Sequence, residues 1–135
     1  LIQSVDSWHH ADELNRRANA ASKRQDALIQ VNTSGEEQKS GCDPWDVEEL
    51  VGDIVALENL RILGVMTIGP LTDDEEEIAP AFQELHSIFD RLMSTDLHGG
   101  EMRYCSMGMT GDWKIALAEG SNMLRIGRAI FGERA

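Results

Sequence analysis

The sequence is poor in cysteine and contains no long apolar run. Its two cysteines, Cys42 and Cys105, share no metal-ligand spacing with each other or with the four histidines, so no metal site is expected. Unpaired thiols suit a reducing compartment, and the expected localisation is therefore cytoplasmic. No stretch approaches the roughly 20 apolar residues that cross a bilayer, so we expect no membrane partner.

Basic residues are also scarce. Lys and Arg total 12 against 24 Asp and Glu, which gives a formal net charge of -12. A surface with this charge repels a phosphate backbone, so a nucleic-acid partner is excluded. Hydrophobic residues make up 41% of the 135 residues, which is enough for a buried core in one domain over residues 1–135.

Short strand-like runs alternate with longer segments of helical period. Strands are predicted at 1–5, 27–32, 60–67, 102–106 and 122–126. Helices are predicted at 8–24, after 43, after 72, at 111–119 and at 127–131. This alternation is typical of parallel strands joined by right-handed helical crossovers, and both a doubly wound sheet and a (β/α)8 barrel fit it.

Polar residues and glycines gather where the last two predicted strands end. Ligands of parallel α/β proteins bind beyond the carboxyl ends of the strands. Ser106 precedes Gly108, and Gly127 precedes a helical turn; such turns can expose N–H groups to a phosphate, but glycine also ends many strands for steric reasons alone. Arg125 lies inside an apolar strand, where its guanidinium either reaches solvent or a carboxylate, or provides a fixed positive charge beside a ligand.

Five stretches carry a family resemblance when they are taken together. They are SVDS (4–7), IQVNTSGEEQKSG (29–41), GVMTIGP (64–70), SMGMTGD (106–112) and GSNMLRIGRAIFGER (120–134). In this order they resemble the pyridoxal phosphate homeostasis protein family, which is related to the barrel domain of alanine racemase. The resemblance implies an α/β fold of the (β/α)8 TIM-barrel type, of which this chain would supply about the last five strands as the C-terminal portion.

The resemblance also implies a cofactor site. The family holds pyridoxal 5′-phosphate (PLP), acts in vitamin B6 homeostasis and shows no established turnover. Ser106, Gly127 and Arg128 would bind the phosphate, and Arg125 would face the pyridine nitrogen. A cation at that nitrogen disfavours protonation of the ring, so the cofactor is a poorer electron sink than one that faces a carboxylate.

The lysine that forms a Schiff base with PLP in the family has no counterpart in this chain. Lys23, Lys39 and Lys114 match no family position. We therefore expect PLP binding without covalent attachment, no catalytic residue and no enzyme activity. Because the first strands of the barrel would be missing, the open edges at 1–5 and 122–126 would favour self-association.

Two alternatives remain open at this stage. One is a PLP-dependent racemase or decarboxylase of the same barrel class; such racemases use a tyrosine as a second base, and Tyr104, the one tyrosine in the sequence, lies inside a predicted strand. The other is a barrel fragment that binds no ligand.

Overall fold

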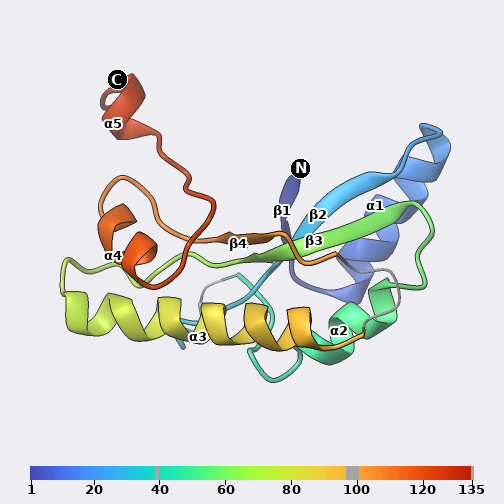
Figure 1. Ribbon diagram of the computed structural model, residues 1–135. Coiled ribbons are helices and arrows are strands. Elements are labelled where there is room, and N and C mark those ends of the chain that lie inside the picture. The colour runs from blue at the N-terminus through green and yellow to red at the C-terminus, as the bar shows by residue number, and fades with distance from the viewer. Residues whose placement is uncertain (39, 97–100, 135) are drawn as a thin grey trace.

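Parallel strands in consecutive order form the frame of the molecule (Figure 1). A computed structural model describes residues 1–38, 40–96 and 101–134. Its elements are β1 (Ile2–Val5), α1 (Trp8–Ala20), β2 (Gln25–Gln30), α2 (Val47–Ile54), β3 (Leu60–Met66), α3 (Glu75–Ser94), β4 (Tyr104–Ser106), α4 (Trp113–Ala118) and α5 (Arg128–Phe131). The strand order is β1-β2-β3-β4 and every neighbouring pair is parallel, as the alternation in the sequence predicts.

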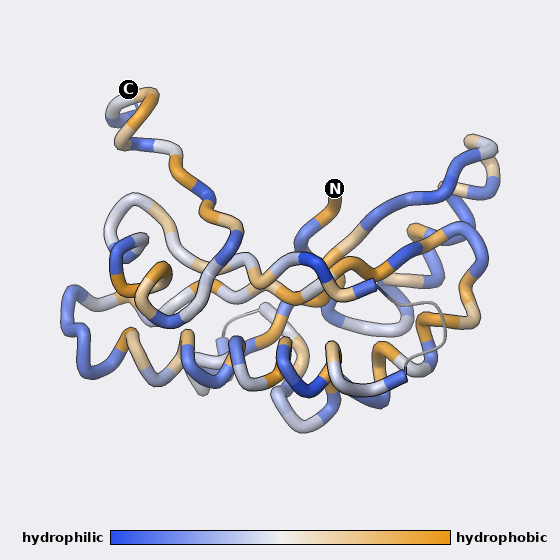
Figure 2. The backbone as a smooth tube through the Cα atoms, viewed as in Figure 1, coloured by the Kyte–Doolittle hydropathy of each residue, from blue (hydrophilic) through white to orange (hydrophobic). Residues whose placement is uncertain are grey.

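The helices α1, α2 and α3 cover one face of the sheet (Figure 1). The main core lies between these helices and the sheet. Its largest fully buried side chains include Ile29, Phe82 and Leu85. A smaller apolar cluster of Leu28, Leu63 and Met66 lies outside this core. Figure 2 shows hydrophobic residues along the strands and at intervals along α3. Both β2 and β3 are therefore largely buried, as expected for central parallel strands.

Local capping explains where the helices begin and end. Ser7 Oγ accepts the His10 N–H at 3.2 Å at the start of α1, and Asp74 Oδ1 accepts the Glu76 N–H at 2.9 Å at the start of α3. The helix α1 ends short of the predicted residue 24 because Ser22 adopts a left-handed conformation with φ of 52°. No helix in the described part of the chain is long and apolar enough to span a membrane.

The regular strand predicted at 122–126 is corrected to a single parallel bridge between Ser106 and Met123. Three backbone hydrogen bonds hold the segment beside β4: Asn122 N–H to Cys105 O (3.2 Å), Met107 N–H to Met123 O (3.2 Å) and Arg125 N–H to Gly108 O (2.9 Å). Two residues after β4, Gly108 has a φ of 100°, a left-handed conformation that does not continue an extended strand. The segment lies where a fifth strand was predicted, but it does not form one.

A close approach between β3 and β4 depends on Gly64. Its partner in the register is Tyr104, and its φ is 153°. A Cβ atom at this position would overlap the Tyr104 carbonyl group, 2.8 Å from the carbonyl carbon. The pairing that places β4 beside β3 therefore requires glycine here.

We predict that Gly64→Ala lowers the free energy of unfolding by roughly 2–4 kcal/mol, because it combines a strained φ with backbone overlap. Urea unfolding followed by circular dichroism measures the change. Gly52→Ala is the matched control, since Gly52 lies inside α2 with nothing within 4 Å of its Cβ position. This substitution should raise the free energy of unfolding by about 0.5–1 kcal/mol. Equal stabilities of the two variants would contradict the prediction.

Candidate functional site

Hydroxyl groups tie together the carboxyl ends of the two central strands. Thr67 Oγ1 donates to the Val31 carbonyl oxygen at 2.8 Å, and Thr33 Oγ1 lies 2.9 Å from Thr67 Oγ1. Thr67 Oγ1 has one proton and gives it to Val31, so Thr33 is the donor between the two threonines. Both threonines are buried. These bonds fix the end of β3 against the segment that follows β2.

Ser106 and Arg125, which the sequence analysis places in one site, are in direct contact. Arg125 Nη1 donates to Ser106 Oγ at 2.7 Å, and Arg125 Nη2 donates to the Thr67 carbonyl oxygen at 2.7 Å. Ser106 Oγ in turn donates to Gln3 Oε1 at 2.7 Å. The Ser106 side chain is fully buried at the end of β4. One guanidinium thus joins the carboxyl ends of β3 and β4.

Arg125 is a partly buried cation whose hydrogen bonds go to neutral oxygens. Burial lowers the pKa of its guanidinium because desolvation disfavours the charged form, and the charge of Asp112 opposes that change. Among the described residues it forms no ion pair within 4.0 Å. An anion that reached this guanidinium would supply the missing countercharge.

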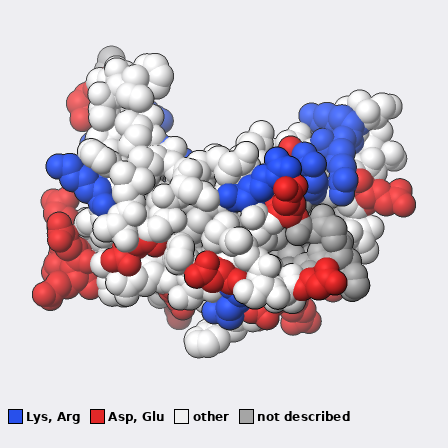
Figure 3. Space-filling view, in the orientation of Figure 1, with Lys and Arg blue, Asp and Glu red and all other residues white. Residues whose placement is uncertain are grey.

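Surface charge does not by itself mark this edge of the sheet. Figure 3 shows Lys and Arg side chains mainly at the upper right, on the part of the molecule where β2 and β3 begin, and Asp and Glu gathered where α3 begins and along the helical side. Near the start of β3, Arg61 pairs with Asp26 at 2.7 Å, and before β4, Arg103 pairs with Glu101 at 2.5 Å. Arg125 is therefore the cation that favours an anion at the carboxyl edge.

Gly127 and Arg128 lie further along the segment that leaves the sheet. Within the described chain, no hydrogen bond uses their backbone N–H groups. The Arg128 side chain is exposed, with Nη1 3.6 Å from Glu133 Oε1. The helix α5 projects from the body in Figure 1, and its nearest tie is the Ala129 N–H to Thr110 Oγ1 at 3.3 Å. The structure does not bring these two residues into contact with Ser106, and their role in phosphate binding stays a prediction.

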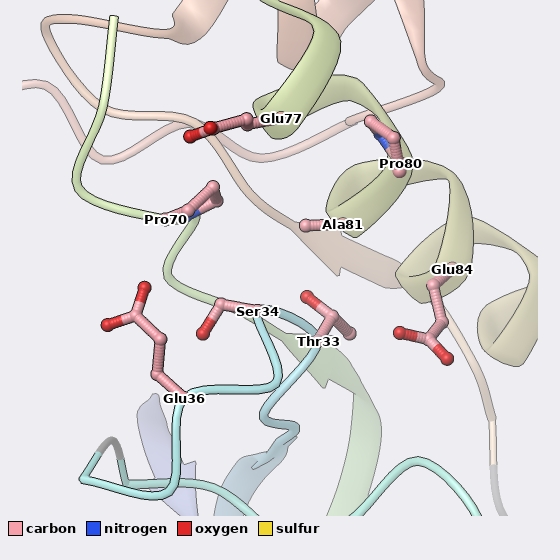
Figure 4. A pocket seen from close by; sticks show the side chains of 8 residues that line it. All are labelled: Thr33, Ser34, Glu36, Pro70, Glu77, Pro80, Ala81 and Glu84. Carbon is pink, nitrogen blue, oxygen red and sulfur yellow. The ribbon is translucent and has the colours of Figure 1, made fainter. Parts of the chain in front are cut away.

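Two neighbouring pockets differ in charge. A pocket of about 330 Å³ lies between the loop after β3 and the turn after β4, and Arg128 and Asp112 are among its lining residues. Another, of about 590 Å³, lies beside the start of α3 (Figure 4). Its side chains are those of Thr33, Ser34, Glu36, Pro70, Glu77, Pro80, Ala81 and Glu84. Three glutamates make this second pocket unsuitable for a phosphate.

Gln3 is the site residue that the sequence analysis missed. It lies in β1, in a run interpreted only as apolar, yet its side chain meets Ser106 of β4. A polar residue within a short strand was the available signal. Of the three lysines, Lys39 lies outside the described residues, and Lys114 Nζ sits 5.6 Å from the centroid of the Trp113 ring. The described residues contain no cluster of His, Cys, Asp and Glu that could hold a metal ion.

Comparison with known proteins agrees with this arrangement. The family model described as alanine racemase, N-terminal domain, matches residues 1–135. The pyridoxal phosphate homeostasis protein of Aquifex aeolicus is 39% identical over 134 residues, which are 99% of this chain and 58% of that protein. The chain therefore spans well under two thirds of the length of this curated relative.

Solved structures show the same likeness. A crystal structure of an unknown protein from Bifidobacterium adolescentis has a TM-score of 0.92 at 42% identity, over 96% of this chain and 52% of that one. PipY of Synechococcus elongatus with PLP bound has a TM-score of 0.84 at 30% identity, over 97% of this chain and 60% of that one. Alanine racemases also match, at identities that show the fold alone. The predicted α/β class of the TIM-barrel type is confirmed.

Both thiols of the chain are predicted to be unreactive in the folded state. Burial raises the pKa of both Cys42 and Cys105 to about 12. At pH 8 an ordinary thiol with a pKa near 9 is roughly one-tenth thiolate, and these thiols should hold about a thousandfold less. Labelling with a chromogenic disulfide should therefore be slow until denaturant unfolds the chain. Rapid labelling of both cysteines at pH 8 without denaturant would contradict this prediction.

Proposed function

Because the chain belongs to the alanine racemase N-terminal domain family, we propose that it binds PLP and serves PLP homeostasis without catalysing a reaction. The observation that supports this proposal is the partly buried contact between Ser106 and Arg125, since the guanidinium has neutral hydrogen-bond partners and no carboxylate within ion-pair distance among the described residues. The proposed setting is the cytoplasm, which suits the free Cys42 and Cys105.

The donors at this edge of the sheet suit the phosphate and ring of PLP. Ser106 can donate its hydroxyl proton to a phosphate oxygen, and the free N–H groups of Gly127 and Arg128 can add further donors. Arg125 can turn from Thr67 toward the pyridine nitrogen, where a cation keeps that nitrogen unprotonated. When bound, PLP supplies an electron-withdrawing ring and an aldehyde, and this environment reduces the capacity of the ring to accept electrons.

The same residues argue for binding rather than turnover. In the described part of the chain, Lys23 and Lys114 lie outside the contacts of Ser106 and Arg125, and Tyr104 is held within β4. A racemase of this class requires two opposed bases at the cofactor. We therefore favour a carrier of PLP over a racemase or decarboxylase.

We also propose that the chain forms the C-terminal portion of a (β/α)8 barrel. Ser106 ends β4 and Arg125 lies in the segment beside it, and barrels commonly bind phosphate near the ends of their last strands. In the described residues β1 pairs on one side only, with β2. The backbone of its other side is then available to another strand.

PLP should bind reversibly and through Ser106 and Arg125. Each charge-assisted hydrogen bond contributes about 1.5–3 kcal/mol, so Ser106→Ala and Arg125→Met should each weaken binding by roughly 10- to 100-fold. Equilibrium dialysis with absorbance detection measures the affinity, and inorganic phosphate should compete. Combining Ser106→Ala with Gly127→Val should abolish the remaining binding.

Arg91→Met is the matched control for the loss of an arginine. Arg91 lies on α3 and pairs with Glu48 at 2.8 Å, on the helical side of the sheet. Its substitution should leave PLP binding unchanged. Borohydride treatment followed by mass spectrometry should find no stoichiometric adduct; fixation of PLP on one specific lysine of this chain would overturn the proposed mode of binding.

Because one edge of β1 is open, we predict that the isolated chain self-associates. Sedimentation velocity over a hundredfold range of concentration should show a weight-average mass that rises above 15.0 kDa. A sharp monomeric species at every concentration, with a two-state melt at high temperature, would contradict this expectation.

A further inference from the structure

Gln3 of β1 reaches Ser106 of β4 even though the two strands lie at opposite edges of the sheet. In a flat sheet, strands three places apart would be separated by roughly 14 Å, well beyond the reach of a glutamine side chain. The 2.7 Å bond between Gln3 Oε1 and Ser106 Oγ therefore requires strong curvature, with both side chains on the concave side. Ile2, the neighbour of Gln3 in sequence, packs on the main core at the other face.

The bonding of Ser106 leaves its hydroxyl proton under the control of Gln3. A serine hydroxyl has one proton and can accept two hydrogen bonds. Arg125 can only donate, so its 2.7 Å contact always occupies an acceptor position of Ser106 Oγ. The hydroxyl proton points at the Gln3 carbonyl oxygen. A phosphate that takes this proton must therefore displace the bond to Gln3.

The geometry points to Gln3 as a positioning residue that directs the Ser106 hydroxyl toward phosphate, an inference that rests on the proposed PLP function. A half-turn of the Gln3 amide exchanges its oxygen for its NH2 group without moving Ser106. The amide then donates to Ser106 Oγ, which accepts from both Gln3 and Arg125 and turns its proton toward the phosphate. The same side chain thus satisfies Ser106 with and without the ligand.

Substitution by glutamate separates this role from simple packing. A carboxylate at position 3 only accepts, so Gln3→Glu holds the Ser106 proton in the orientation that excludes phosphate. Gln3→Glu should weaken binding of inorganic phosphate and of PLP at least about tenfold. Ser4→Glu is the control matched for charge, because Ser4 is the next residue of β1 and is exposed. It should weaken binding less than about threefold.

The decisive measurement is a double-mutant cycle by calorimetry on the full chain, with inorganic phosphate and PLP as separate probes. If Gln3 acts through the Ser106 hydroxyl, Gln3→Glu should lower the binding affinity at least about tenfold in the wild-type background. In the Ser106→Ala background the same substitution should lower it less than about threefold. In chains labelled with ¹⁵N-glutamine, phosphate should shift the Gln3 side-chain NH2 resonance of the wild type and leave that of Ser106→Ala in place. Melting temperatures confirm that each variant is folded.

The possible outcomes separate the two claims. Equal losses from Gln3→Glu in both backgrounds, or equal losses from Gln3→Glu and Ser4→Glu, would assign the effect to charge and overturn the positioning role while PLP binding stands. If Ser106→Ala binds phosphate as tightly as the wild type, or if the wild type binds neither probe, the proposed function fails and the positioning role fails with it.

Discussion

The site depends on one partly buried guanidinium that bonds to two strand ends. Arg125 donates to the Thr67 carbonyl at the end of β3 and to the Ser106 hydroxyl at the end of β4. Parallel strands leave polar groups at their carboxyl edge, and buried polar groups must find partners. Thr33 and Thr67, which follow β2 and β3, find partners through their hydroxyl groups. Ser106, which ends β4, finds a partner in the Arg125 guanidinium. The same bonds leave a positive charge inside the sheet's polar edge, which is the property that suits an anionic ligand.

Local sequence chemistry was sufficient for much of the fold. The apolar runs around Ile29 and Leu63 have the composition of strands buried on both faces, and both form central parallel strands. The helix predicted after residue 72 forms as α3, with Asp74 as its cap. The meeting of Ser106 with Arg125 also follows from sequence, because the ends of neighbouring parallel strands lie at one edge of the sheet.

Other features depend on geometry that no local pattern contains. The contact between Gln3 and Ser106 depends on the curvature summed over four strands, which is a property of the whole sheet. The segment at 122–126 has the composition of a strand, but the residues beside it leave the extended conformation at Gly108, so the two segments share a single bridge. The projection of Arg128 away from Ser106 follows from α5, whose short helix packs little against the body, with Phe131 85% exposed.

The long separation along the chain between Gln3 and Ser106 has a consequence for folding kinetics. These two residues are 103 positions apart, whereas Ser106 and Arg125 are 19 apart. Closing the larger loop costs more chain entropy and comes after the local helices and neighbouring strand pairs can form. The complete hydrogen-bonded constellation around Ser106 therefore belongs to the last stage of folding, so any molecule that requires it selects fully folded chains and shifts the folding equilibrium toward them.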